Sequence, residues 1–364
     1  MRTKLSLYWE LARPFTLIAP ALGMFTGSVI ALGAFSPVPL TPWVATKIAL
    51  GTLMAAVLNA ASNVLNQVTD FEADAINKPG RPLPSGRIAA EEAIRFSGWL
   101  YILAFVLATP VGPQCTLLAG TAAVLTVAYS APPLRWKAIP YLANLVIAIP
   151  RGVLLKVAGW SCVRDFGRLE PWYIGAIFGL FLLGATTTKD FADQRGDAAA
   201  GFRTLPVVHG PKRAAWIVAP FLVLPFLLIP YGVARGILTG NPHLLHALTV
   251  LLCVWGSYVV YLMVRRPDDL ARTENHPSWT HMYVMMFVAQ IGFGLAYLIR
   301  STQGFPRVSR PPVRRSPHSR SSHLDHVHRP RLASGHLVSV RLVPRPGTPV
   351  GECTPSGYSR PPRG

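Results

Sequence analysis

Residues 50–86 read LGTLMAAVLNAASNVLNQVTDFEADAINKPGRPLPSG, and this stretch changes character abruptly near its middle. Its first sixteen residues carry no charge, whereas Asp70, Glu72 and Asp74 then follow within five residues. A helix that crosses a bilayer needs about 20 mainly apolar residues. The stretch therefore predicts a membrane-spanning helix that ends in an acidic segment.

The whole chain shares this apolar character. Hydrophobic residues make up 51% of its 364 residues and charged residues only 14%, against about 25% charged residues in typical soluble domains. Nine apolar runs approach the length of a bilayer span, although the short link between 94–111 and 114–130 leaves eight as an alternative. We predict an all-α, polytopic membrane protein with spans at 15–35, 44–66, 94–111, 114–130, 140–158, 172–188, 214–235, 245–264 and 281–299.

The basic residues predict how these spans are oriented, because Lys and Arg accumulate in cytoplasmic loops. They gather at the N-terminus and in four loops, 67–93, 131–139, 189–213 and 265–280. Three other loops have none: 36–43, 111–114 and 237–244. Only the loop 159–171 breaks this alternation. We therefore predict a multi-pass protein, expected in a prokaryotic cell membrane, with a cytoplasmic N-terminus and no cleaved signal sequence.

The segment 301–364 differs in composition from the segment 1–300. It contains eleven Arg and no Lys, is rich in Pro and Ser, and shows no helical or strand period. Such segments are usually disordered, so we predict a transmembrane domain at 1–300 and a disordered basic tail. An out-of-frame reading of a GC-rich gene is an alternative origin of the tail. We expect the bilayer, and no nucleic acid, as the large partner.

Three polar residues at the end of the second span have helical spacing. Asn66, Asp70 and Asp74 stand at i, i+4 and i+8, so they would share one face of a helix that continues from the span. Glu72 is offset by half a turn. An oxygen-rich face at a helix end suits Mg²⁺, which one or two carboxylates commonly hold together with phosphate oxygens and water. A solvated helix end is the alternative.

The loop that follows, NKPGRPLPSGR, combines prolines with cations. The prolines restrict the backbone, and Lys78, Arg81 and Arg87 are held among them. Arg offers paired donors to phosphate, and Lys offers a compact positive charge. A metal on one side and these cations on the other would suit a diphosphate.

A second acidic cluster lies at the end of the sixth predicted span. Asp190, Asp193 and Asp197 stand at i, i+3 and i+7, which is again one helical face, although Gly196 is expected to weaken the helix locally. Lys189 lies beside them. By the predicted topology both clusters are at the same membrane face. Two carboxylate clusters there could share Mg²⁺ ions around one diphosphate and neutralise its charge.

With these motifs the sequence resembles the UbiA superfamily of intramembrane prenyltransferases over about residues 10–300. The family patterns fall on Asn66, Asp70 and Asp74, on the loop NKPGRPLPSG, and on Asp193 and Asp197 within KDFADQRGD. The resemblance implies about nine helices around a central cavity. It implies Mg²⁺ ligands at Asn66, Asp70, Asp74, Asp190, Asp193 and Asp197, with the four residues Asp70, Asp74, Asp193 and Asp197 essential for catalysis, and diphosphate binding by Asn66, Lys78, Arg81 and Lys189.

A third matching stretch, YSAPPLRWK at 129–137, raises the expectation that Tyr129, Ser130 or Lys137 reaches the site. Inside the fifth span, Arg151 would be costly unless it faces a polar cavity or pairs with a neighbouring helix. The flanking Pro150 and Gly152 predict a broken helix. Lys156 is expected to extend to the outer interface.

These residues predict a membrane-embedded transferase that moves an isoprenyl group from a prenyl diphosphate to an acceptor. An aromatic quinone precursor is the leading acceptor. LRWK and IPRG are similar to the homogentisate type, whereas INKPGRPLPSGRI is similar to the chlorophyll-synthase and archaeal lipid types. Chlorophyllide and lipid glycerol-phosphate acceptors therefore stay open. A terpene cyclase of the same fold and a transporter are further alternatives, and a transporter would place its site nearer the midplane.

Overall fold

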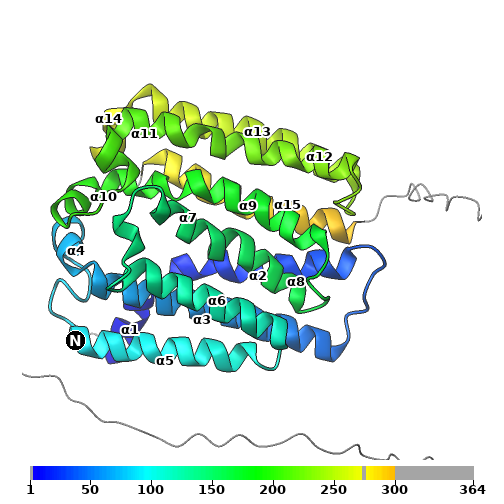
Figure 1. Cartoon of the computed structure of the whole chain (residues 1–364), viewed down its shortest axis with the longest axis horizontal. Coiled ribbons are helices and arrows are strands. Elements are labelled where there is room, and N and C mark those ends of the chain that lie inside the picture. Colours follow the sequence, from blue (N-terminus) through cyan, green and yellow to red (C-terminus); the bar gives the residue numbers. More distant parts are fainter. Residues whose placement is uncertain (1–2, 273–275, 300–364) are drawn as a thin grey trace, which may run out of the picture. The chain divides into compact units, whose positions relative to one another are not determined.

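A computed structural model of the chain describes residues 3–272 and 276–299 (Figure 1). The described residues form helices and contain no strand, which confirms the all-α prediction. The predicted tail lies outside them. The α-helices are α1 (Lys4–Ala12), α2 (Ile18–Gly33), α3 (Pro42–Thr69), α4 (Phe71–Asn77), α5 (Ala90–Ala108), α6 (Pro113–Ser130), α7 (Leu142–Ala148), α8 (Leu155–Ser161), α9 (Leu169–Ala185), α10 (Thr187–Ala199), α11 (Leu205–Val223), α12 (Leu228–Ala234), α13 (Pro242–Arg265), α14 (Pro267–Arg272) and α15 (Pro277–Leu298).

Seven helical segments within the described residues are long and apolar enough to cross a membrane. The runs predicted at 94–111 and 114–130 form α5 and α6, which are not among these seven. The polytopic fold is confirmed, and the predicted number of nine spans is approximate. The seven segments are Pro14–Gly33, Pro42–Thr69, Leu142–Ser161, Leu169–Ala199, Leu205–Ala234, Pro242–Arg265 and Pro277–Leu298.

Local sequence fixes where several helices begin. Pro42 and Pro242 stand in the first turn of α3 and α13, where a missing backbone N–H costs nothing. The residues before them are caps. The Thr41 side chain accepts a hydrogen bond from the amide of Val44, and the Asn241 side chain accepts from the amides of His243 and Leu244.

The long helices pack into a ring around a central cavity. α2 packs on α3, α8 and α15; α3 packs on α5 and α6; α9 packs on α7, α8 and α11; and α13 closes the ring between α11 and α15. Glycine permits a close approach at several of these crossings. A Cβ atom at Gly159 of α8 would lie 2.4 Å from the carbonyl oxygen of Met24 in α2, so the two helices approach each other as small residues allow in membranes.

The fifth predicted span is widened rather than broken. α7 and α8 are joined by a π-helical turn, η3 (Ile149–Leu154), and the amide of Leu155 donates to the carbonyl of Pro150. Pro150 has no N–H of its own, and the wider turn re-satisfies the backbone around it. The expectation of a broken helix was therefore wrong. η3 carries Arg151 on this widened turn and packs against α9.

Lys156 does not extend to the outer interface as predicted. Its side chain is buried, donates to the carbonyl of Gly23 at 3.3 Å and to Oγ1 of Thr26 at 2.9 Å, and lies over the ring of Phe178. Position 156 faces α2 across the close α2–α8 crossing. The neighbouring helix thus supplies acceptors that replace water, which a single sequence does not reveal.

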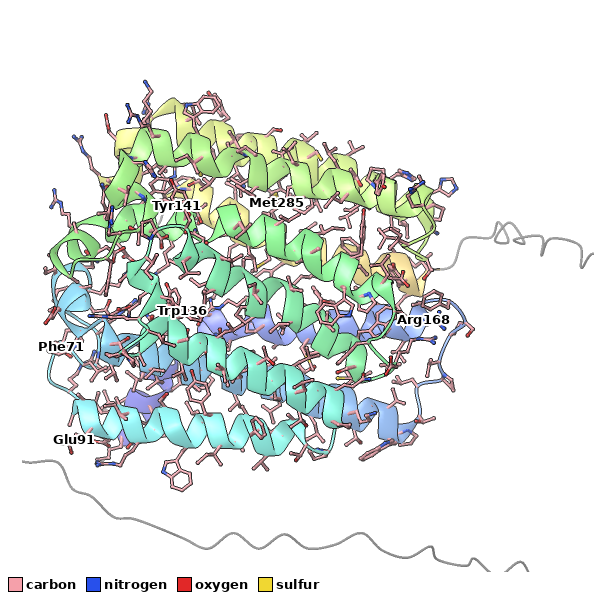
Figure 2. All side chains as sticks on the ribbon, in the orientation of Figure 1. Phe71, Glu91, Trp136, Tyr141, Arg168 and Met285 are labelled. Carbon is pink, nitrogen blue, oxygen red and sulfur yellow. The ribbon has the colours of Figure 1, made fainter. Side chains whose placement is uncertain are left out.

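The exceptional loop 159–171 lies at the opposite end of the bundle from the acidic motifs. Figure 2 shows Arg168 there, far from Phe71. Arg164 donates to the carbonyl oxygens of Ala31 and Ala34 at 2.6 and 2.8 Å, which lie at the C-terminal end of α2. A cation there donates hydrogen bonds to carbonyl groups that have no partner within the helix. Its charge also interacts favourably with the negative end of the helix dipole. This capping role of Arg164 explains why the loop 159–171 carries positive charge, although the loops 36–43, 111–114 and 237–244 contain no Lys or Arg.

Candidate active site

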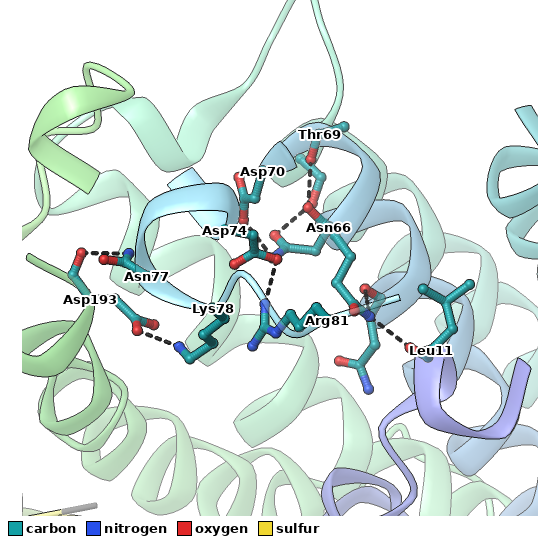
Figure 3. Close-up of polar contacts among 12 residues, drawn as sticks. Leu11, Asn66, Thr69, Asp70, Asp74, Asn77, Lys78, Arg81 and Asp193 are labelled. Atoms are coloured by element: carbon teal, nitrogen blue, oxygen red, sulfur yellow. Dashed lines mark hydrogen bonds and ion pairs between the residues drawn. The ribbon is translucent and has the colours of Figure 1, made fainter. Parts of the chain in front are cut away.

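The two acidic clusters meet at one end of the bundle, where α4 packs on α10 (Figures 1 and 3). In the first cluster the helical hydrogen bonds continue across the α3–α4 junction, because the amides of Asp70 and Asp74 donate to the carbonyls of Asn66 and Asp70. The Asn66 side chain also donates to Asp70 at 2.6 Å. Asn66 and Asp70 therefore share a face, as their spacing predicts.

The second cluster lies on one continuous helix. α10 includes Asp190, Asp193 and Asp197, and it persists through Gly196. The expected local weakening at Gly196 was wrong. The glycine instead leaves room for α4. A Cβ atom at position 196 would lie 2.4 Å from the Asn77 side chain and 2.5 Å from the carbonyl oxygen of Ala73. Gly196 thus lets α4 touch α10.

Asn77 joins the two clusters, and the sequence reasoning missed it. Its amide nitrogen donates to the carbonyl of Asp193 at 2.8 Å, and its oxygen accepts from the amide of Gly196 at 2.9 Å (Figure 3). One side chain therefore satisfies a donor and an acceptor of the facing helix. The available signal was its place at the start of NKPGRPLPSG, which does not say that its partner is α10.

Cations pair with three of the six predicted metal ligands. Asp193 pairs with Lys78 and, at 2.9 Å, with Lys189, while Asp74 pairs with Arg81. Asp70 pairs with Lys137, which also donates to Thr69 at 2.7 Å. Every one of these charges is balanced at short range within a partly buried site, where an unpaired charge would be costly.

Burial shifts the pKa values of ionisable side chains at this end of the bundle. Burial is the largest effect on Lys78 and lowers its pKa to about 8, with the charge of Lys189 adding to the decrease and Asp193 opposing it. Burial also raises the pKa of Asp70, and the ammonium group of Lys137 opposes that rise. Lys78 is therefore charged at neutral pH and loses its charge in mildly alkaline solution.

This pKa gives a testable pH dependence for a diphosphate ligand. Lys78 attracts the anion only while protonated, so the affinity is full below pH 8 and falls as the pH rises through that value. We expect the KM for a prenyl diphosphate to increase about tenfold between pH 7 and pH 9, the effect of one charged hydrogen bond. The variant Lys78→Arg keeps its charge and should show a flat profile; an identical rise in both proteins would assign the titration to another group.

A cavity of about 230 Å³ begins beneath the clusters and runs into the bundle. Of the predicted site residues, Asn66, Lys189, Asp190, Tyr129 and Arg151 line it. The other six residues predicted to bind metal or diphosphate do not line it and lie at the end of the bundle: Asp70, Asp74, Asp193, Asp197, Lys78 and Arg81. The polar end of the cavity is therefore continuous with the two acidic clusters.

A second, smaller chamber of about 60 Å³ adjoins this cavity. It shares Pro150, Arg151 and Leu155 with the first, and side chains such as Met24 and Met54 make its walls almost wholly apolar. The lining of the two chambers thus changes from carboxylate side chains at one end to hydrocarbon side chains at the other. That gradient matches a ligand with an anionic head and an apolar chain.

Two other predicted residues lie beside the cavity. Ser130 is buried and donates to Asn66 at 3.2 Å. Lys137 is buried against Asp70 and does not line the cavity. The structure therefore places Ser130 and Lys137 where they position the first acidic cluster rather than in contact with a ligand in the cavity.

The oxygen atoms at this end of the bundle suit Mg²⁺, although no three His, Cys, Asp or Glu side chains of the described residues form a metal cage by themselves. Mg²⁺ needs no such cage, since one or two carboxylates with phosphate oxygens and water suffice. Each cluster supplies that number. Asp190 lines the cavity and makes no hydrogen bond or ion pair with another described residue. The residues thus fit an ion shared between protein and diphosphate.

Comparisons with known proteins agree with this geometry. The chain is 29% identical over 291 residues to digeranylgeranylglyceryl phosphate synthase of Thermococcus kodakarensis, covering 80% of this chain and 98% of that protein. It is 31% identical over 212 residues to the bacteriochlorophyll synthase 34 kDa chain of Chloroflexus aurantiacus, covering 57% and 66%. A UbiA homologue from Archaeoglobus fulgidus, solved with GPP and Mg²⁺, has the same fold, with a TM-score of 0.63, 21% identity and coverage of 80% and 99%.

The family model is matched over most of the membrane domain. Residues 21–288 fit the UbiA prenyltransferase family, a range that includes both acidic clusters and most of the residues that line the cavity. The resemblance stated from the motifs is thereby confirmed. This chain belongs to the UbiA prenyltransferase family.

Proposed function

We propose that this prenyltransferase moves an isoprenyl group from a prenyl diphosphate to a lipid acceptor that carries a glycerol-phosphate head. The observation that carries the transferase reaction is the meeting of two carboxylate clusters, one on α3–α4 and one on α10, at the mouth of a cavity that becomes apolar. The acceptor follows the names of the relatives, seven of which are digeranylgeranylglyceryl phosphate synthases.

The proposed roles follow from position and charge. Asp70, Asp74, Asp193 and Asp197 would hold Mg²⁺ together with Asn66 and Asp190. Lys78, Arg81 and Lys189, which now pair with Asp193 and Asp74, would bind the diphosphate oxygens. Mg²⁺, when bound, supplies positive charge that neutralises the departing diphosphate.

The chain's own residues shape the reaction. The apolar chamber holds the prenyl chain, and the α3–α4 and α10 clusters hold the diphosphate at the mouth. The carbon–oxygen bond breaks with its electron pair leaving on the diphosphate, and the allylic cation is captured by the acceptor hydroxyl, which then loses its proton. Water is kept away by the surrounding helices and by the loop 78–87, which supplies Lys78 and Arg81 to the site. The N-terminus and the site face the cytoplasm of a prokaryotic cell in this proposal.

An aromatic quinone precursor, the leading acceptor from the sequence, becomes the second candidate. The relatives favour the glycerol-phosphate and chlorophyllide alternatives, since none of those named above is a quinone enzyme. A terpene cyclase would need no acceptor at all. A transporter is disfavoured because the carboxylates gather at one end of the bundle, whereas transporter sites lie near the midplane.

The test is a product analysis with purified protein in lipid. Mg²⁺, geranylgeranyl diphosphate and one acceptor at a time are supplied: an alkylglyceryl phosphate, a chlorophyllide, hydroxybenzoate or none. We expect diphosphate release and a prenylated ether lipid only with the alkylglyceryl phosphate. Turnover with hydroxybenzoate alone would support the quinone reading, and a cyclised hydrocarbon formed without acceptor would support the cyclase. Transport of a prenyl diphosphate without bond cleavage would reject all three.

A further inference from the structure

Arg151 is a cation in the middle of the bundle without a carboxylate partner. Four cations beside the acidic clusters, Lys78, Arg81, Lys137 and Lys189, pair with carboxylates. The Arg151 side chain makes no hydrogen bond or ion pair with any described residue, and it lines the cavity together with Tyr129 and Tyr283. The predicted alternative of an ion pair to a neighbouring helix is therefore not what the described residues show.

The backbone presents this guanidinium to the cavity. Arg151 lies on the π-helical turn η3, lines both chambers, and is solvent-accessible although it stands in the middle of a span. Its accessible surface therefore faces the cavity. An unpaired charge at such depth is costly and marks a ligand site.

Two more groups of the same cavity lack partners. The guanidinium of Arg13 lines it and makes no hydrogen bond or ion pair with a described residue; burial, Arg81 and Arg151 together lower its pKa to about 10. The Gln290 side chain also lines the cavity and is buried, and its oxygen has no donor. The cavity thus contains two guanidinium groups without a carboxylate partner among the described residues and one amide oxygen without a hydrogen-bond donor.

An allylic cation formed in this cavity would be repelled by an unpaired guanidinium. An anion on Arg151 removes that repulsion and replaces the missing partner. Two guanidinium groups that repel each other match a dianion better than a single carboxylate charge, and Arg forms its strongest paired hydrogen bonds with phosphate. The oxygen of Gln290 requires a donor, which a hydroxyl on the same ligand supplies.

We propose that Arg151, assisted by Arg13, binds a phosphate monoester on the prenyl acceptor, and that Gln290 accepts a hydrogen bond from that acceptor's hydroxyl. This inference rests on the proposed transferase function and specifies which part of the cavity recognises the acceptor. It separates two anion sites: the diphosphate at the paired cations of the cluster end, and the acceptor phosphate at the unpaired guanidinium groups within the bundle.

The experiment compares matched acceptors in the full chain reconstituted in lipid. An alkylglyceryl phosphate, the same alkylglycerol without phosphate, and the same lipid ending in a carboxylate are each tested with geranylgeranyl diphosphate. We expect wild type to prefer the phosphate by at least about tenfold in kcat/KM, the effect of a charge-assisted hydrogen bond.

Arg151→Gln should lower kcat/KM for the phosphate lipid by about 10- to 100-fold and leave the alkylglycerol within about twofold, with Arg151→Lys between. Arg235→Gln, at an exposed site outside the cavity, is the control.

Several results would overturn the assignment. Equal use of phosphate and alcohol by wild type, preference for the carboxylate, or an equal loss with both lipids in Arg151→Gln would each do so. Calorimetric binding of the alkylglyceryl phosphate without prenyl diphosphate tests the site independently of turnover: binding by wild type that Arg151→Gln loses supports it. If this binding is seen but no acceptor releases diphosphate, the transferase proposal fails and the anion site stands.

Discussion

Replacing Asp193 by Ala is expected to reduce prenyl transfer by about a thousandfold, which corresponds to several kcal/mol of lost charge stabilisation. Asp193 is the most heavily engaged carboxylate of the site. It pairs with Lys78 and Lys189, and its backbone carbonyl accepts from Asn77. The change removes a proposed metal ligand and also leaves two lysines without a partner, so the diphosphate loses both its metal and its ordered cations.

The matched control for this prediction lies in the first cluster. Glu72 stands between Asp70 and Asp74 but is exposed and makes no hydrogen bond or ion pair with a described residue. Glu72→Ala should keep activity within about twofold, as expected for a surface carboxylate. Diphosphate release from geranylgeranyl diphosphate at saturating Mg²⁺ is the measurement. Full turnover by Asp193→Ala would contradict the model of two cooperating clusters.

Gly196→Ala is expected to lower activity by about a hundredfold although Gly196 is not itself a proposed ligand. Its new Cβ atom would collide with the Asn77 side chain and with the carbonyl of Ala73, so α4 and α10 must move apart. A displacement of about 1 Å between reacting groups can cost about a hundredfold in rate. Overpacking should also destabilise the fold by about 1–3 kcal/mol.

Gly80→Ala tests whether this effect belongs to the contact between α4 and α10. Gly80 lies in the loop that follows α4, and a Cβ atom there would meet nothing within 4 Å. Its thermal unfolding midpoint and its activity should therefore match wild type. Normal activity of Gly196→Ala, measured with the same substrates, would show that the spacing of the two clusters does not control the rate.

Most of the fold could be predicted because a bilayer imposes simple rules on sequence. Apolar length predicts a span, and proline with a capping residue predicts a helix start, as at Thr41 and Asn241. Apolar runs that lie near the minimum length and hydropathy of a bilayer span do not decide the count. α5 and α6 are such runs, and the number of spans is therefore approximate. Periodicity likewise placed Asp190, Asp193 and Asp197 on one helix, since side chains three and four residues apart share a face.

Side-chain partners could not be predicted in the same way, because they depend on which helices become neighbours. Lys156 turns toward α2, whose Gly23 carbonyl and Thr26 hydroxyl accept its hydrogen bonds. Asn77 matters only because Gly196 allows α10 to approach. Neither choice is encoded in a local pattern of residue types.

The sequence by itself determined the helical membrane class, the two acidic clusters and their cationic loop, because these follow from apolar length, helical period and charge within short segments. Tertiary structure alone decided that α4 and α10 meet through Asn77 and Gly196, that a π-helical turn directs Arg151 into the cavity, and that Arg13 joins it there. The physical reason is that contact between distant segments depends on packing around the whole ring, which no single segment contains.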